Sequence, residues 1–311
     1  MQGSRGVDRR CGFAFPIAKD QDEDRQNNLR MNPRVQSELA VRLVGLWIYP
    51  IKSCAGVAVE NVELDEQGGF KGDREWAVIN ANRELVWQGG IPKMALVRLS
   101  LQSDGLLLHA PGVLPLRLTI SDGAKPCDVR IWNEGQRSFD TFVGHGSSSE
   151  ADAWFSDFLE QPLRLVRLGD SARQRPTLNP LHLLASSSLN QLNSRLNEQG
   201  HAGVSVERFR PNLLIDSPEG NLEPFAEENF ASVNWSHGTR ATMLRMEDPC
   251  ARCIMPNIDL NDARVGKEPL ATIGQMSRDR GKVNSVYFGV YGRGISSGTL
   301  NRGELGWAKI G

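Results

Sequence analysis

The sequence predicts a mainly β protein with a few helices, of the α+β class, built as two β-barrel-like units. Short apolar runs recur along most of the chain, separated by turns rich in glycine and proline, which is typical of antiparallel strands. Strands do not alternate regularly with helices, so a doubly wound α/β sheet is a poor fit. Because no internal repeat is visible either, two β-barrel-like units are the preferred interpretation.

The first unit is predicted over residues 39–160. Strands are expected at the apolar runs 43–49, 57–64, 76–79, 96–101 and 116–120. One amphipathic helix closes the unit, with Ser149 as its N-cap and Pro162 beyond its end. The apolar face of this helix carries Ala151, Trp154, Phe155, Phe158 and Leu159.

The second unit is predicted over residues 161–311. It opens with a strand at 163–165 and continues through a helix at about 187–197, whose apolar face carries Leu189, Leu192 and Leu196. Further strands are expected near Leu213, Val233, Met243 and Val286. Residues 1–38 are rich in Arg, Asp, Gln and Asn and predict a disordered tail, within which Met31 is an alternative start of translation.

The charge balance excludes some classes of partner. Thirty-six Lys and Arg residues face thirty-seven Asp and Glu residues, so no whole-chain field recruits nucleic acid or an anionic membrane. No apolar stretch is long enough to span a bilayer, and the acidic run at 20–24 argues against a signal peptide. Five cysteines are an odd number and too sparse for a disulfide scaffold. We therefore expect a cytoplasmic protein without nucleic-acid or membrane partners.

The sharpest local motif is Cys250-Ala-Arg-Cys253. A structural zinc site needs four ligands and no second pair completes one, while a thioredoxin-like dithiol needs a βαβ context that the pattern lacks. No cysteine follows Cys253, so we expect no iron–sulfur cluster in this chain. Two interpretations stay open: one reactive thiolate stabilised by Arg252, or two buried, inert cysteines.

Cationic side chains accompany polar ones in three further segments. Lys52 lies beside Ser53, Arg74 follows Gly-Asp, and Arg210 precedes Asn212 across a proline. Cations combined with hydroxyl and amide groups suit a phosphate-like anion. Taken singly, each is more often a surface charge at the end of a strand.

Six motifs together carry a resemblance to a known family. They run in order from about Val41 to the end: Tyr49-Pro-Ile-Lys-Ser-Cys54, Gly72-Asp-Arg-Glu-Trp76, Leu181-His-Leu-Leu184, Phe209-Arg-Pro-Asn212, Cys250-Ala-Arg-Cys253 and Phe288-Gly-Val-Tyr291. In this order they resemble the MOSC superfamily, in the branch with an added N-terminal barrel that includes the mitochondrial amidoxime-reducing component. The resemblance makes 39–160 a MOSC N-terminal β-barrel domain and 161–311 a MOSC domain.

The resemblance implies a molybdenum cofactor (molybdenum-molybdopterin), with Cys253 as the catalytic residue and the metal ligand. Cys250 would be a supporting neighbour. The residues implied to bind the cofactor are Lys52, Ser53, Arg74, Asn179, Arg210, Asn212, Ala251, Arg252 and Tyr291. Such a cofactor agrees with the chemistry, because a phosphorylated group needs cations and a soft metal accepts a thiolate.

The activity implied is reduction of small N-hydroxylated compounds, such as hydroxylamines, amidoximes and N-hydroxylated bases. Electrons would come from a separate ferredoxin- or flavoprotein-like partner. The alternative is a cofactor carrier or a sulfur-transfer protein that acts through a cysteine persulfide. Pyridoxal phosphate binding is a description of the family only. The chain departs from many relatives at Trp87-Gln88-Gly89, where they have Thr-Gln-Arg, which removes a cation near the expected substrate entrance.

Overall fold

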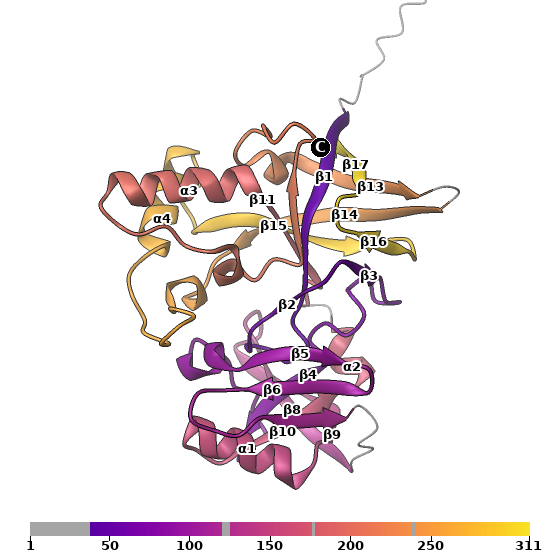
Figure 1. Ribbon diagram of the computed structural model, residues 1–311, viewed down its shortest axis with the longest axis vertical. Coiled ribbons are helices and arrows are strands. Elements are labelled where there is room, and N and C mark those ends of the chain that lie inside the picture. Colours follow the sequence, from indigo (N-terminus) through magenta and orange to yellow (C-terminus); the bar gives the residue numbers. More distant parts are fainter. Residues whose placement is uncertain (1–37, 120–124, 176–177, 238–239) are drawn as a thin grey trace, which may run out of the picture. The chain divides into compact units, whose positions relative to one another are not determined.

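The computed structural model describes residues 38–119, 125–175, 178–237 and 240–311. The chain divides into two units, 1–36 and 37–311, and the fold below is that of the second. Of the predicted disordered tail, only Glu38 lies within the described residues, as the first residue of a strand. The predicted class is confirmed, because strands dominate and α-helices are few (Figure 1).

The largest sheet closes into a seven-stranded barrel in the order β12-β11-β15-β14-β13-β17-β1, with β1 returning to pair with β12. These strands are β1 (Glu38–Ile48), β11 (Leu181–Ala185), β12 (Leu213–Asp216), β13 (Phe230–His237), β14 (Arg240–Ala251), β15 (Tyr287–Gly294) and β17 (Leu305–Ile310). The short β2 (Val57–Ala58) extends this sheet from β1, and β3 (Asn61–Glu63) pairs with β16 (Thr299–Asn301). Because the sheet closes, no barrel strand is left as an edge strand that could pair with another chain.

Two smaller sheets form the rest of the first half. One has the order β4-β10-β9-β8 and the other β5-β6-β7. Their strands are β4 (Trp76–Asn80), β5 (Arg98–Gln102), β6 (Gly105–His109), β7 (Leu116–Thr119), β8 (Pro126–Asn133), β9 (Ser138–Gly146) and β10 (Leu163–Leu168). The predicted strand through residue 120 is confirmed as far as Thr119, and Ile120 lies outside the described residues.

Chain order and strand pairing differ at two places. β1 comes first in the sequence but pairs with β17 and β12 in the closed barrel. β10 follows the helix α1 (Ser149–Leu159) and pairs with β4 and β9. Residues 51–55 contact the smaller sheets, after which the chain returns to the barrel sheet at β2 and enters the smaller sheets at β4. The candidate site is built around residues 49–56 and the start of β4.

The predicted amphipathic helix is confirmed as α1, with its apolar face buried against the small sheets. Its N-cap was predicted one residue too late. The side chain of Ser148, which has an extended backbone, accepts a hydrogen bond from Ala151 N at 3.2 Å. Ser149 is instead the first helical residue, because only the residue before the helix can turn its oxygen toward the free backbone amides.

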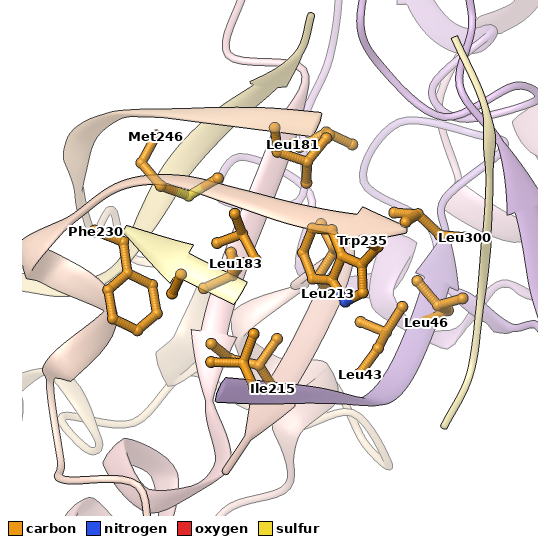
Figure 2. Close-up of a cluster of buried hydrophobic side chains, with 14 of the residues drawn as sticks. Leu43, Leu46, Leu181, Leu183, Leu213, Ile215, Phe230, Trp235, Met246 and Leu300 are labelled. Carbon is orange, nitrogen blue, oxygen red and sulfur yellow. The ribbon is translucent and has the colours of Figure 1, made fainter. Parts of the chain in front are cut away.

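The barrel interior is filled by alternate residues of its strands. Leu43 of β1 and Leu213 of β12 are fully buried there, around the indole of Trp235 (Figure 2). Burying each large apolar side chain of this kind stabilises the fold by roughly 1.5–3 kcal/mol. The barrel is therefore a packed core that can hold loops at its ends in fixed positions.

Two helices cover the outside of the barrel. α3 (Ser186–Glu198) confirms the helix predicted near 187–197, and α4 (Leu270–Asp279) was not predicted. The remaining short elements are α2 (Asp170–Arg173), η1 (Pro92–Leu96), η2 (Val206–Phe209), η3 (Ala226–Asn229) and η4 (Met255–Asn257). None of the helices in the described part of the chain has the length and apolar character needed to cross a bilayer.

Candidate cofactor site

Strand pairing brings the predicted segments together. Antiparallel pairing of β1 with β12 places residues 210–212 beside the end of β1, where Trp47 N donates to Asn212 O at 3.0 Å. Lys52 N donates to Trp76 O at 2.8 Å, so the segment that follows β1 lies along the start of β4. On the other side of β11, His182 lies opposite Tyr291 of β15. Motifs that are about 240 residues apart in the sequence thus meet at one end of the barrel.

Asn212 is the hub of this region. Its side chain is fully buried, and its Nδ2 donates to Trp47 O at 3.1 Å. Its Oδ1 accepts from Arg74 Nη1 and from His182 N, both at 3.2 Å. All but one of the hydrogen-bonding positions of the amide are thereby used within the protein. Asn212 therefore fixes the Arg74 guanidinium relative to the barrel.

Tyr49 supports two of the predicted arginines. The guanidinium of Arg210 lies 4.2 Å from the centre of the buried Tyr49 ring, and that of Arg74 lies 5.1 Å from it. Contacts of this kind hold a guanidinium by cation–π attraction. Arg210 also donates to the backbone oxygen of Cys54, and the Tyr49 hydroxyl donates to Pro211 O at 3.0 Å. The two cations are held in place before any ligand binds.

Backbone conformation marks the same residues. Ser53, Arg74 and Arg210 have φ values of +71°, +50° and +54°, in the left-handed region that non-glycine residues rarely adopt. They are three of the eight non-glycine residues with positive φ in the described part of the chain. Each such conformation costs of the order of 1 kcal/mol, and such residues cluster at functional sites.

The cations outnumber the carboxylates in this cluster. Burial, reinforced by the positive charges of Arg210, Arg175 and Arg74, lowers the pKa of Lys52 to about 8. Burial likewise lowers the pKa of Arg210 to about 10. Asp73, which forms an ion pair with Arg74, is the carboxylate in contact with the cluster, and burial raises its pKa despite that pair. The region therefore has an excess of positive charge that favours an anion.

A cavity of about 140 Å³ opens beside Lys52 and Arg74. Its other lining residues are Asp65, Gln67, Gly69, Phe70, Asp73, Leu168, Arg173, Arg175, Leu178 and Pro180. Sequence reasoning missed Arg173 and Arg175, for which the only signal is the charged run Arg173-Gln-Arg175. Arg173 is neutralised by Asp65 at 2.8 Å, whereas Arg175 adds to the excess charge near Lys52. Asn179 is exposed, between two lining residues.

The two cysteines of the Cys250-x-x-Cys253 motif differ in environment. Cys250 lies near the end of β14, is 3% exposed, and its Sγ accepts from Arg252 Nη1 at 3.0 Å. Cys253 is exposed, and its sulfur lies close enough to Lys52 to favour the charged ammonium. In the described residues, no three His, Cys, Asp or Glu side chains gather in a way that could hold a metal ion. Cys253 is the thiol of this pair that a ligand can reach.

Arg252 points into the protein and anchors the segment that carries Cys253. Besides Cys250, it donates through Nη2 to Phe209 O at 2.8 Å, and its guanidinium lies 5.7 Å from the Phe209 ring centre. The Nε of Arg252 is buried without a partner in the described residues. Ala251, the preceding residue, is exposed and lies opposite Tyr287 in the β14–β15 ladder. Arg252 thus joins the cysteine segment to the loop before β12.

The Phe288-Gly-Val-Tyr291 motif packs against His182. Gly289 has φ +77°, and a Cβ there would lie 2.3 Å from His182 Nε2, so only glycine fits. Burial and the Arg252 charge hold the pKa of His182 well below its usual range, and Nε2 lies 3.2 Å from Phe288 O. Burial, with a contribution from Cys250, raises the pKa of Tyr291. His182 and Tyr291 are therefore neutral polar groups beside the cysteine segment.

Comparison with known proteins identifies the family. The profile of the MOSC N-terminal beta barrel domain matches residues 40–162, and that of the MOSC domain matches residues 165–305. The mouse mitochondrial amidoxime-reducing component 1 is 30% identical, over 73% of this chain and 69% of that protein. The chain belongs to the MOSC superfamily. The expected mainly β MOSC fold is confirmed by these matches, and the strand topology shows it as one closed seven-stranded barrel with a half-barrel of smaller sheets.

Two kinds of MOSC protein are among the relatives. The rat mitochondrial amidoxime reducing component 2 is 28% identical, over 83% of this chain and 80% of its own length. The zebrafish molybdenum cofactor sulfurase is 30% identical over 80% of this chain, which spans 31% of that longer protein. The two kinds of relative have different names and activities, and the sulfurases are the ones named for a molybdenum cofactor.

Proposed function

We propose that this protein is a molybdenum-cofactor-dependent reductase of small N-hydroxylated compounds. The observation that carries the proposal is the exposed thiol of Cys253 beside a preformed, cation-rich cluster at the end of the MOSC barrel. Relatives named as amidoxime-reducing components align over most of the chain, which supports a reductase. In this proposal the thiolate of Cys253 is the ligand to the metal.

The residues present fit such a cofactor. Ser53 Oγ is buried and has no partner in the described residues, although a buried hydroxyl normally finds one. A phosphate oxygen would give it an acceptor and would compensate the positive charges of Lys52, Arg74 and Arg210. Ala251, Arg252 and Tyr291 would border the organic part of the cofactor, with Asn179 at its edge, while the fully buried Asn212 would act by holding Arg74. When bound, the cofactor supplies the two-electron redox chemistry.

The protein's own groups would bind and orient the cofactor and the substrate, and water would supply the protons. Reduction of an N–OH group to N–H consumes two electrons and two protons and releases water. Lys52 Nζ, whose pKa of about 8 in the ligand-free protein keeps it mostly protonated at neutral pH, would bind the anionic cofactor. Arg252 would act by positioning, since its hydrogen bonds fix the backbone that presents Cys253.

Turnover separates the two candidate functions. Protein expressed with a full supply of cofactor is mixed with an amidoxime and a chemical one-electron donor such as reduced methyl viologen. Formation of the amidine by the wild type, but not by Cys253→Ala, supports the reductase. The matched control is Cys127→Ala, which removes a partly buried cysteine on β8.

The second candidate is a cofactor carrier or a sulfur-transfer protein, favoured by the relatives named as molybdenum cofactor sulfurases. It predicts stable sulfane sulfur on Cys253, detected by mass spectrometry, together with no amidine in the same assay. The reductase in turn requires an external electron-transfer protein, ferredoxin- or flavoprotein-like, and in this proposal acts in the cytoplasm. Cell fractionation tests the location.

A further inference from the structure

A turn of the first half presents an exposed indole. The backbone amides of Gly90 and Ile91 both donate to Trp87 O at 2.9 Å, which closes the turn tightly. The Trp87 side chain is 38% exposed. Its neighbour Gln88 is 2% exposed, so the turn buries Gln88 and leaves the indole at the surface.

The indole lies next to the residue that follows Cys253. A Cβ on Gly89 would lie 2.2 Å from Trp87 Cη2 and 2.8 Å from Ile254 Cγ2. Both side chains therefore occupy the space beside the Gly89 backbone, and a side chain at position 89 would clash with both of them. Ile254 is itself 37% exposed. Trp87 and Ile254 form one accessible apolar surface, called the Trp87–Ile254 platform below.

The exposed thiol of Cys253 thus has two different neighbours. One is the Lys52 ammonium, which is close enough to interact with the sulfur electrostatically. The other, the Trp87–Ile254 platform, begins at the residue that directly follows Cys253 in the chain. A substrate bound near Cys253 can place a polar group toward the cation and a flat apolar group on the indole, whose face stacks on other rings. An alkyl substituent gains less, because it offers no flat face.

We propose that Trp87, supported by Ile254, determines substrate specificity and selects compounds whose N-hydroxylated group is attached to a planar aromatic ring. The part of this inference that concerns reduction rests on the proposed function, whereas binding of the aromatic ring to the platform does not. The Trp87–Ile254 platform also depends on Gly89, because a side chain at this position would displace the indole from Ile254.

The test compares benzamidoxime with acetamidoxime, which carry the same reacting group on an aryl and on an alkyl substituent. We expect Trp87→Ala to raise KM for benzamidoxime about tenfold with little change in kcat, since a stacking contact is made equally in the ground and transition states. Trp87→Phe should keep most of the preference. The control Trp132→Ala removes an indole that is 45% exposed on β8 and should behave as wild type. Equal effects of Trp87→Ala on both compounds overturn the inference.

Binding to metal-free protein separates this inference from the proposed function. Saturation-transfer NMR is recorded for benzamidoxime with wild type, Trp87→Ala and Gly89→Ala, the last of which keeps the indole but displaces it. Binding to the metal-free protein that is weakened in both variants supports the platform; if the cofactor-loaded wild type then reduces neither compound, the proposed function is contradicted while the platform stands. Equal binding by all three proteins overturns the platform, whether or not the protein turns over.

Discussion

Replacing Lys52 by methionine should stabilise the metal-free protein. The Lys52 pKa is lowered from 10.5 to about 8, mainly by burial and then by neighbouring arginines. The charged ammonium therefore lowers the free energy of unfolding. Because the folded pKa lies below the unfolded one, the unfolded state binds more protons between about pH 8 and 10.5, and stability rises with pH across that window. Methionine keeps the length of the side chain and removes the charge.

The shift sets the size of the effect. Each pKa unit corresponds to about 1.4 kcal/mol, so the cost at pH 7 is at most about 3 kcal/mol, and partial exposure of the side chain reduces the expected gain to about 1–3 kcal/mol. Urea unfolding of metal-free wild type and Lys52→Met measures it at pH 7 and pH 9.5, where the difference should fall by about half. Lys71→Met, at a well-exposed lysine, is the control. A destabilised Lys52→Met protein, or a difference independent of pH, would refute this electrostatic account.

Two further predictions concern buried polar groups. Asn212→Ala should destabilise the protein by about 2–4 kcal/mol in urea unfolding, because it leaves Trp47 O and His182 N buried without this partner; a change below about 0.5 kcal/mol would contradict the role of Asn212 as a hub. Burial raises the pKa of Glu227 from 4.5 to about 7. The contribution of Glu227 to the free energy of unfolding is therefore fully present below pH 4.5 and is lost as the pH rises through 7. Glu227→Gln, which retains an acceptor for Ser188, should flatten the stability profile between pH 5 and 8 by up to about 3 kcal/mol, and an unchanged profile would count against the shift.

The strands and two of the helices could be predicted because their patterns are strong. α3 places Leu192 and Leu196 one turn apart on its buried face, as its sequence indicates. α4 was missed because Thr272, Gly274 and Ser277 share its buried face with Ile273 and Met276, which blurs the apolar period. Barrel closure, through pairing of β1 with β12, depends on strands far apart in the chain and has no local signal.

The site was predictable only in part, and for a related reason. The motifs indicate which segments carry cations and thiols, but not that Asn212 holds Arg74 or that Arg252 turns inward to Cys250. Asn212 and Arg74 are far apart in the sequence, so no motif spacing could predict their contact. Arg252 and Cys250 are close in the sequence, but the motif does not show that the Arg252 side chain turns inward. Arg175 belongs to an irregular segment with no apolar period, so its position near Lys52 appears only in three dimensions.

The central claim is that Cys253 holds a molybdenum cofactor in this protein. The most direct measurement is molybdenum per chain, by inductively coupled plasma mass spectrometry, for wild type, Cys253→Ala and Cys127→Ala purified from cells with a full supply of cofactor. We expect close to one molybdenum per chain in the wild type and the control, and a large loss in Cys253→Ala. Equal molybdenum in all three proteins would contradict the assignment of Cys253 as the ligand.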